Sequence, residues 1–161
     1  MCAHVACDSM TRMMHDLVRP PKARRGEHIA VLSPSFAAAG AFPEVHEQAM
    51  RRLTEVTGLF PVEYPTTREV GATPQARAAD VNAAFADPAV RAIIAVVGGE
   101  DQITVIPYID AGLARRDPKP FVGTSDNTNI HHRRDARDHR PRRVRRRRGS
   151  LGRPDRLALF R

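Results

Sequence analysis

The sequence has little of what stabilises secreted mini-domains or membrane proteins. Its 161 residues include only two cysteines and no tryptophan, and aromatic residues make up 5% of the chain. Two cysteines cannot supply a disulfide scaffold. No stretch of about eighteen consecutive apolar residues occurs, so a transmembrane helix is excluded. The N-terminal segment also lacks the continuous apolar core of a secretory signal. We therefore expect a cytoplasmic protein without a membrane partner.

Positive charge is concentrated at one end of the chain. The net charge is +8. Residues 131–161 alone carry +10, from thirteen arginines and three aspartates, whereas residues 1–130 carry a net charge of −2. The body of the protein is therefore mildly acidic, and the overall charge says nothing about what that body binds.

These shifts in composition predict three segments. Residues 1–25 have little periodicity and should form a flexible N-terminal segment. Cys2, His4 and Cys7 lack the second ligand pair of a typical metal site, so we expect no metal and no cofactor. Residues 26–132 have the pattern of an α/β domain. Residues 133–161 form an Arg-rich tail without helix or strand periodicity, which we expect to be disordered.

Two interpretations of the tail remain open. It contains no lysine and no glutamate, and arginine with proline, glycine and alanine is typical of GC-rich codons read out of frame. This composition favours a frame-disrupted or truncated gene product. The alternative is a basic arm that binds nucleic acid non-specifically through its phosphates, and such binding would weaken steeply with salt.

Within residues 26–132, short apolar runs alternate with amphipathic segments. Val45, Ala49, Leu53 and Val56 share the predicted inner face of one helix. Ala78, Val81 and Phe85 share that of another. The predicted strands are residues 28–33, 59–64, 91–97 and 119–125, and the predicted helices are residues 43–58, 73–87, 101–110 (interrupted at Pro107) and 111–116. This order implies right-handed crossovers and a mostly parallel, flavodoxin-like sheet flanked by helices.

Three strand ends carry the residues that suggest chemistry. Ligands of such sheets bind beyond the carboxyl ends of the strands. There the sequence places residues 33–35, the Gly98-Gly99-Glu100-Asp101-Gln102 segment and residues 123–126. Two glycines after a buried strand permit a sharp turn with positive φ that leads into a helix N-terminus, as in a nucleophile elbow. The alternative is an ordinary turn capped by Asp101. The glycine spacing is not that of a dinucleotide-binding loop.

Several segments together resemble a known family. "VRPPKARRGEHIAVLSPS", "ARAADVNAAFADPAVRAIIAVVGG" and "VIPYIDAGLARRDPKPFVGTSDNTNIHH" are similar to the N-terminal domain of the LD-carboxypeptidase and microcin-immunity type of serine peptidases. The resemblance covers residues 17–132. It implies a fold like that of class I glutamine amidotransferases, followed in the family by a second domain. It also implies hydrolysis of amide bonds in murein peptides or peptide-nucleotide antibiotics, hence peptidoglycan recycling or antibiotic immunity, with a small peptide or carboxylate as ligand.

The chain departs from this family at the nucleophile. The resemblance places Gln102 where the family has its catalytic serine, and a carboxamide cannot be activated by a base. Thr104 would point away from that position along a helix. The oxyanion-hole N–H groups would be those of Gly99 and Ile103. The remaining candidate binding residues are Gly98, Glu100, Asp101, Ser125 and Asp126. The last two should cap the next helix and brace the site loop. The alternative for Ser125 is a nucleophile, for which nothing nearby in the sequence supplies a base.

The chain also departs from the family after His132. The family takes its general base, a Glu and a His, from the second domain, whereas the resemblance ends at that point. We therefore expect a truncated, catalytically incompetent relative. The predicted strand at residues 120–123 would lack an outer neighbour, and its open edge favours self-association.

Overall fold

The computed structural model describes residues 19–135. Most of the predicted N-terminal segment lies outside the described residues, including Cys2, His4 and Cys7. The same holds for the tail from residue 136, and with it the frame-disruption and nucleic-acid hypotheses.

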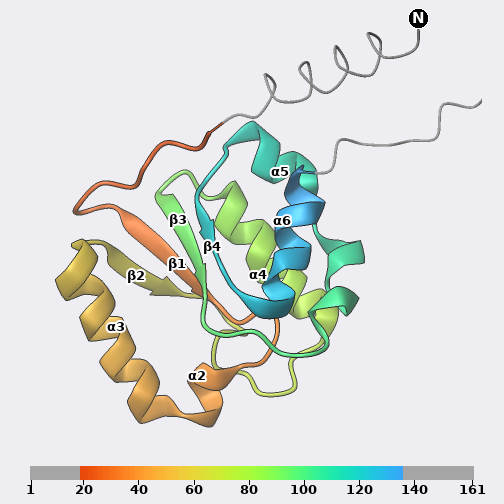
Figure 1. Cartoon of the computed structure of the whole chain (residues 1–161), viewed down its shortest axis with the longest axis horizontal. Helices are drawn as coiled ribbons and strands as arrows, with labels where there is room; N and C mark the ends of the chain where they lie inside the picture. The colour runs from red at the N-terminus through yellow and green to blue at the C-terminus, as the bar shows by residue number, and fades with distance from the viewer. Residues whose placement is uncertain (1–18, 136–161) are drawn as a thin grey trace, which may run out of the picture.

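A four-stranded sheet organises the fold. Its strands are β1 (His28–Leu32), β2 (Phe60–Glu63), β3 (Val90–Ala95) and β4 (Phe121–Val122). Their order is β2-β1-β3-β4, and each neighbouring pair is parallel. The predicted α/β class with a parallel sheet is therefore confirmed (Figure 1).

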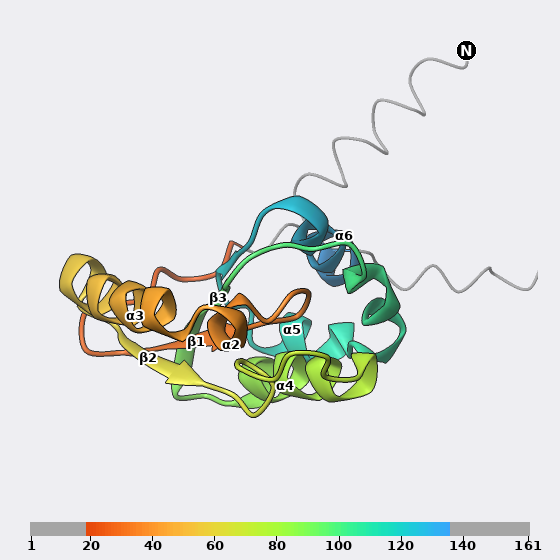
Figure 2. The same cartoon turned by 90° about the horizontal axis from the view of Figure 1, so that it is seen from below.

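The helices divide between two regions of the molecule. Helix α3 lies beside β2, whereas α4, α5 and α6 gather on the β3–β4 side (Figures 1 and 2). The α-helices are α2 (Ala38–Ala41), α3 (Pro43–Thr57), α4 (Pro74–Ala86), α5 (Ala111–Arg116) and α6 (Thr128–Asp135), and the 3-10 turns are η1 (Gln102–Thr104), η2 (Ile106–Tyr108) and η3 (Ser125–Asn127). No helix among residues 19–135 is both long and apolar enough to cross a membrane.

Helices α3 and α4 begin and end at the residues that the sequence indicates. Pro43 occupies the first turn of α3, and Gly58 ends that helix in the left-handed conformation with φ 71°. The Thr73 side chain caps α4 by accepting from the N–H of Ala76, and Pro74 follows it. Local sequence therefore sets the limits of both crossover helices.

The main core lies between the sheet and α4. Ala78, Val81 and Phe85 are buried there, as predicted, against Leu32 and Ile93 of the two central strands. Strand β3 carries buried residues on both faces, as its continuous apolar sequence predicts.

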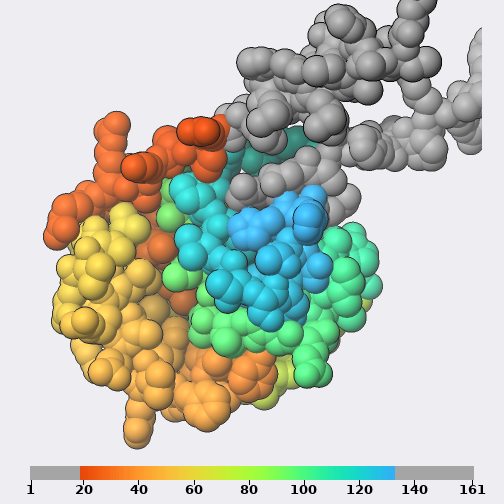
Figure 3. All heavy atoms as spheres, in the orientation of Figure 1, coloured from red at the N-terminus to blue at the C-terminus, as the bar shows by residue number. Residues whose placement is uncertain are grey.

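The predicted inner face of α3 is wrong. Val45 and Val56 are 65% and 70% exposed, and of the four predicted residues only Leu53 packs against a buried cluster. The atoms of α3 form one side of the molecular surface in Figure 3. The helix contacts the edge strand β2, none of whose four residues is itself buried. The residue that α3 does bury is His46, whose Nε2 lies 3.2 Å from Oε1 of Glu63.

The helix predicted over residues 101–110 is also wrong. Two 3-10 turns, η1 and η2, replace it, and Pro107 lies in the second. The Asp101 side chain caps neither turn because it pairs with Arg77 instead.

Lys119, which is distant in the sequence, forms hydrogen bonds with the carboxyl end of α4. Its side chain is 0% exposed. Its ammonium group donates to the carbonyl oxygens of Ala84, at 2.9 Å, and Phe85, at 3.0 Å, and to that of Asp87. The last carbonyls of a helix have no partner within the helix. The segment before β4 is thereby tied to the end of α4.

Replacing Lys119 by methionine keeps the length of the side chain and removes these three hydrogen bonds. We expect the free energy of unfolding to fall by roughly 2–4 kcal/mol, because buried carbonyls lose their donor. Urea denaturation measures this loss. The exposed Lys22→Met is the matched control and should change little. Equal stability of Lys119→Met and the wild type would contradict the assignment.

Candidate functional site

The carboxyl ends of β1, β3 and β4 converge at one place. Strands β1 and β3 are neighbours in the sheet, while the chain continues from β1 to β2 on one side and from β3 to β4 on the other. Such a switch in direction opens a crevice at the strand ends. Ser35, Gly99 and Asp126, which follow these three strands, lie together there.

The carboxylate of Asp126 joins the three strand ends. Its Oδ2 accepts a hydrogen bond from the Ser35 hydroxyl at 2.7 Å and from the Gln102 N–H at 3.3 Å. Its Oδ1 accepts from the Gly99 N–H at 2.9 Å. One side chain therefore fixes the loop after β1 and the turn after β3.

The two glycines after β3 serve a purpose other than the predicted one. Neither has positive φ. They allow close approach instead: a Cβ on Gly98 would lie 2.5 Å from Cβ of Ser125, and one on Gly99 would lie 2.3 Å from the Ser35 Oγ. The positive φ occurs at Ser125, at 60°, on the turn after β4.

Gln102 lies beneath the surface at this junction. Its side chain is 0% exposed, and neither Oε1 nor Nε2 has a hydrogen-bond partner among the residues that the structure describes. Ile103, next in the chain, is exposed, and the Thr104 hydroxyl donates to the carbonyl of Asp101 at 2.7 Å. The N–H of Gly99, one of the two predicted oxyanion donors, is already bonded to Asp126.

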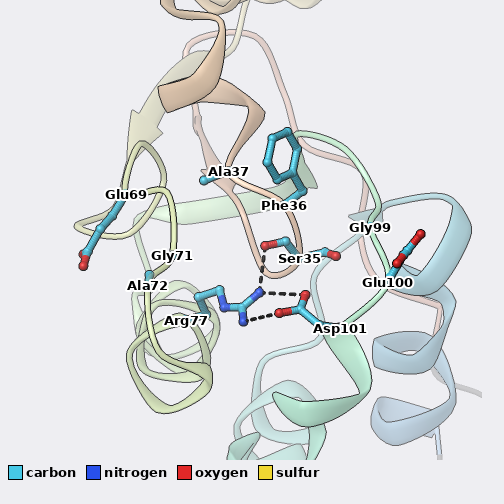
Figure 4. A pocket seen from close by; sticks show the side chains of 10 residues that line it. All are labelled: Ser35, Phe36, Ala37, Glu69, Gly71, Ala72, Arg77, Gly99, Glu100 and Asp101. Carbon is cyan, nitrogen blue, oxygen red and sulfur yellow. Dashed lines mark hydrogen bonds and ion pairs between the residues drawn. The ribbon is translucent and has the colours of Figure 1, made fainter.

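A cavity of about 510 Å³ opens beside the junction. It lies between residues 35–37, the Glu69–Ala72 turn and residues 99–101, with Arg77 also lining it. Glu69 and Glu100 stand on opposite sides of the cavity in Figure 4, and their carboxylates point away from Arg77.

Arg77 and Asp101 form an ion pair on the wall of this cavity (Figure 4). Nη2 of Arg77 lies 2.7 Å from Oδ2 of Asp101, and Nη1 lies 3.1 Å from Oδ1. Nη1 also donates to the carbonyl oxygen of Ser35 at 2.8 Å. These hydrogen bonds from Arg77 lower the pKa of the Asp101 carboxyl below its ordinary value.

A second set of hydrogen bonds holds the opposite wall. The Asp80 carboxylate accepts from the N–H and the hydroxyl of Thr66, at 2.7 and 2.6 Å. The Thr67 hydroxyl donates to the carbonyl of Val31, and the Ser33 hydroxyl donates to the carbonyl of Thr67. The turn that leads to Glu69 is thereby fastened to β1 and α4.

The sequence analysis did not identify Arg77 as a site residue, and it gave Ser35 no role. Arg77 precedes Val81 by four residues and so falls on the predicted buried face of α4. A buried arginine requires a partner, which was the available signal. Among residues 19–135, no three His, Cys, Asp or Glu side chains are grouped closely enough to hold a metal ion.

The sequence model of the LD-carboxypeptidase N-terminal domain, of the peptidase S66 family, matches residues 29–137. The chain belongs to this family. Its relatives include the carboxypeptidase-family protein SCO6489 of Streptomyces coelicolor, 35% identical over 126 residues. That match covers 73% of this chain and 39% of the relative. A carboxypeptidase-family protein of Vibrio cholerae is 33% identical over 64% of this chain and 32% of its own length.

Solved structures show the same N-terminal fold. The MccF-like protein of Bacillus anthracis is 32% identical with a TM-score of 0.66, over 71% of this chain and 36% of that protein. The MccF-like protein of Streptococcus pneumoniae, solved in complex with AMP, is 29% identical with a TM-score of 0.56, over 65% of this chain and 33% of that protein. The chain thus spans about a third of the length of the proteins it matches.

The ion pair on the cavity wall leads to a pH prediction. The pKa of Asp101 is lower in the folded state than its ordinary value, so the ionised carboxylate stabilises the fold at pH values above that ordinary pKa. This contribution is lost as the pH falls through the lowered pKa. Replacing Arg77 by methionine should return the pKa of Asp101 toward its ordinary value and remove this contribution. Carboxyl ¹³C NMR titration of wild type and variant measures the change. An unaltered Asp101 titration in the variant would show that Arg77 does not set it.

Proposed function

We propose that the α/β domain binds a small peptide-like ligand with a free carboxylate in the cavity beside Gly99, and that it does not hydrolyse this ligand. The observation that carries the proposal is the complete burial of Gln102, the residue that the sequence resemblance aligns with the family's nucleophile. Family membership supports the ligand class, and the residues at the site argue against the reaction.

Three features oppose hydrolysis. A carboxamide at residue 102 provides no oxygen that a base can activate. The N–H groups of Gly99 and Gln102 are directed at the Asp126 carboxylate, so they do not stabilise an oxyanion in this arrangement. The serine hydroxyl that contacts a carboxylate, that of Ser35, belongs to a residue only 3% exposed.

The charges around the cavity refine the ligand. Arg77 is paired with Asp101, so the wall they share is nearly neutral. Glu69 and Glu100 add two carboxylates that have no ion-pair partner among residues 19–135. A ligand that carries an ammonium group as well as a carboxylate suits this arrangement, and murein peptides contain both groups.

Reaction of the full chain with a serine-reactive phosphonate probe tests the absence of a nucleophile. We expect no labelling. With a murein tetrapeptide, turnover should not exceed the residual ~10³–10⁴-fold acceleration that remains when a catalytic triad is incomplete. An active serine peptidase is the positive control. Stoichiometric labelling that disappears in Ser35→Ala or Ser125→Ala would contradict the proposal and identify the nucleophile.

A further inference from the structure

Two hydrogen-bond donors that line the cavity are already bonded to a carboxylate of the same chain. Ser35 and Gly99 line the cavity, and both donate to the carboxylate of Asp126. The N–H of Gln102, which lies behind the cavity lining, donates to the same carboxylate. A hydroxyl and two backbone N–H groups that converge on one carboxylate are a common way to bind an acidic ligand.

Asp126 lies on a turn whose backbone conformation is unfavourable. Ser125, immediately before it, has φ 60°, which costs a residue other than glycine on the order of 1 kcal/mol or more. The turn is fastened by the hydrogen bonds of Asp126 and by Asn127, whose Nδ2 donates to the carbonyl of Val97 at 3.1 Å. Asp126 is half-buried and Ser125 is exposed, so solvent reaches the turn.

We propose that Asp126 is an internal competitor for the carboxylate site of the cavity. Its side chain occupies the Ser35, Gly99 and Gln102 donors, and a ligand carboxylate binds by displacing it together with the strained Ser125–Asp126 turn. This inference rests on the proposed function, because it concerns the carboxylate of the same ligand.

The geometry distinguishes this role from that of a purely structural staple. A staple needs only to bridge two loops, which the bond between Ser35 and Asp126 already does. Two further donors from the turn after β3 complete the set around the carboxylate, and two of its three donors, Ser35 and Gly99, line the cavity. Removing a bridge that is closed to the cavity would not admit a free carboxylate, whereas removing one from a site that opens to the cavity would.

Acetate is the probe. The full chain and its Asp126→Ala variant are titrated with sodium acetate, and the ¹⁵N–¹H resonances of Gly99 and Gln102 are followed by NMR. Sodium chloride at equal ionic strength is the salt control. We expect saturable shifts of both resonances in the variant, with an affinity for acetate at least about tenfold higher than in the wild type, and no such shifts with chloride.

Asp110→Ala is the matched control variant. Asp110 also accepts a backbone N–H, that of Gly112 at 2.7 Å, but outside the cavity. Its removal should leave the affinity for acetate at the wild-type level. If Asp126→Ala does not fold, Asp126→Asn takes its place. It retains an acceptor oxygen but lacks the charge, and it should also bind acetate more tightly than the wild type.

A folded Asp126 variant that binds acetate no better than the wild type would overturn the inference and leave Asp126 a structural bridge. Acetate contains no bond to hydrolyse, so this outcome is independent of the probe-labelling experiment. Labelling of a serine would overturn the proposed lack of hydrolysis without altering the acetate result.

Discussion

The arrangement of the site depends on one carboxylate that three strand ends share. Asp126 arrives from β4 and accepts hydrogen bonds from the loop after β1 and from the turn after β3. The segments that would contact a ligand are short and irregular, and backbone groups in such segments need partners. Asp126 supplies those partners. The spacing between Ser35 and Gly99, and hence the edge of the cavity, follows from its position.

The residues around Asp126 are those that fit a closely packed junction. Gly98 and Gly99 are glycines because Ser125 and Ser35 approach too closely for a Cβ. Gln102 lies under the turn, where its amide has no hydrogen-bond partner among the described residues, and Oδ1 of Asn127 is in the same condition. Unpaired buried polar atoms are uncommon in folded proteins and are found where function limits the packing. Gln102 is thus part of the protein interior, with no exposed surface.

Much of the fold was predictable from local sequence. The succession of strands and helices along the chain and the limits of α3 and α4 follow from apolar periodicity, the proline positions and the Thr73 cap. The exposed face of α3 was not predictable, because periodicity gives the apolar stripe of a helix but not how much of it the sheet can cover. The helix predicted over residues 101–110 was wrong for a related reason. Asp101 pairs with Arg77, which lies on α4, 24 residues away in the sequence. The segments of the site were predictable as strand ends, whereas the role of Asp126 depends on contacts between distant segments.

Hydrogen exchange at the Gly99 amide tests the central claim, that the Asp126 carboxylate holds this junction, most directly. The rate is measured in the full chain and in Asp126→Ala, with the Gly112 amide, which is bonded to Asp110, as internal reference. A hydrogen bond to a charged group contributes about 1.5–3 kcal/mol, so exchange at Gly99 should accelerate by roughly tenfold or more in the variant while Gly112 stays unchanged. Equal protection of Gly99 in both proteins would show that the junction is held by something other than Asp126.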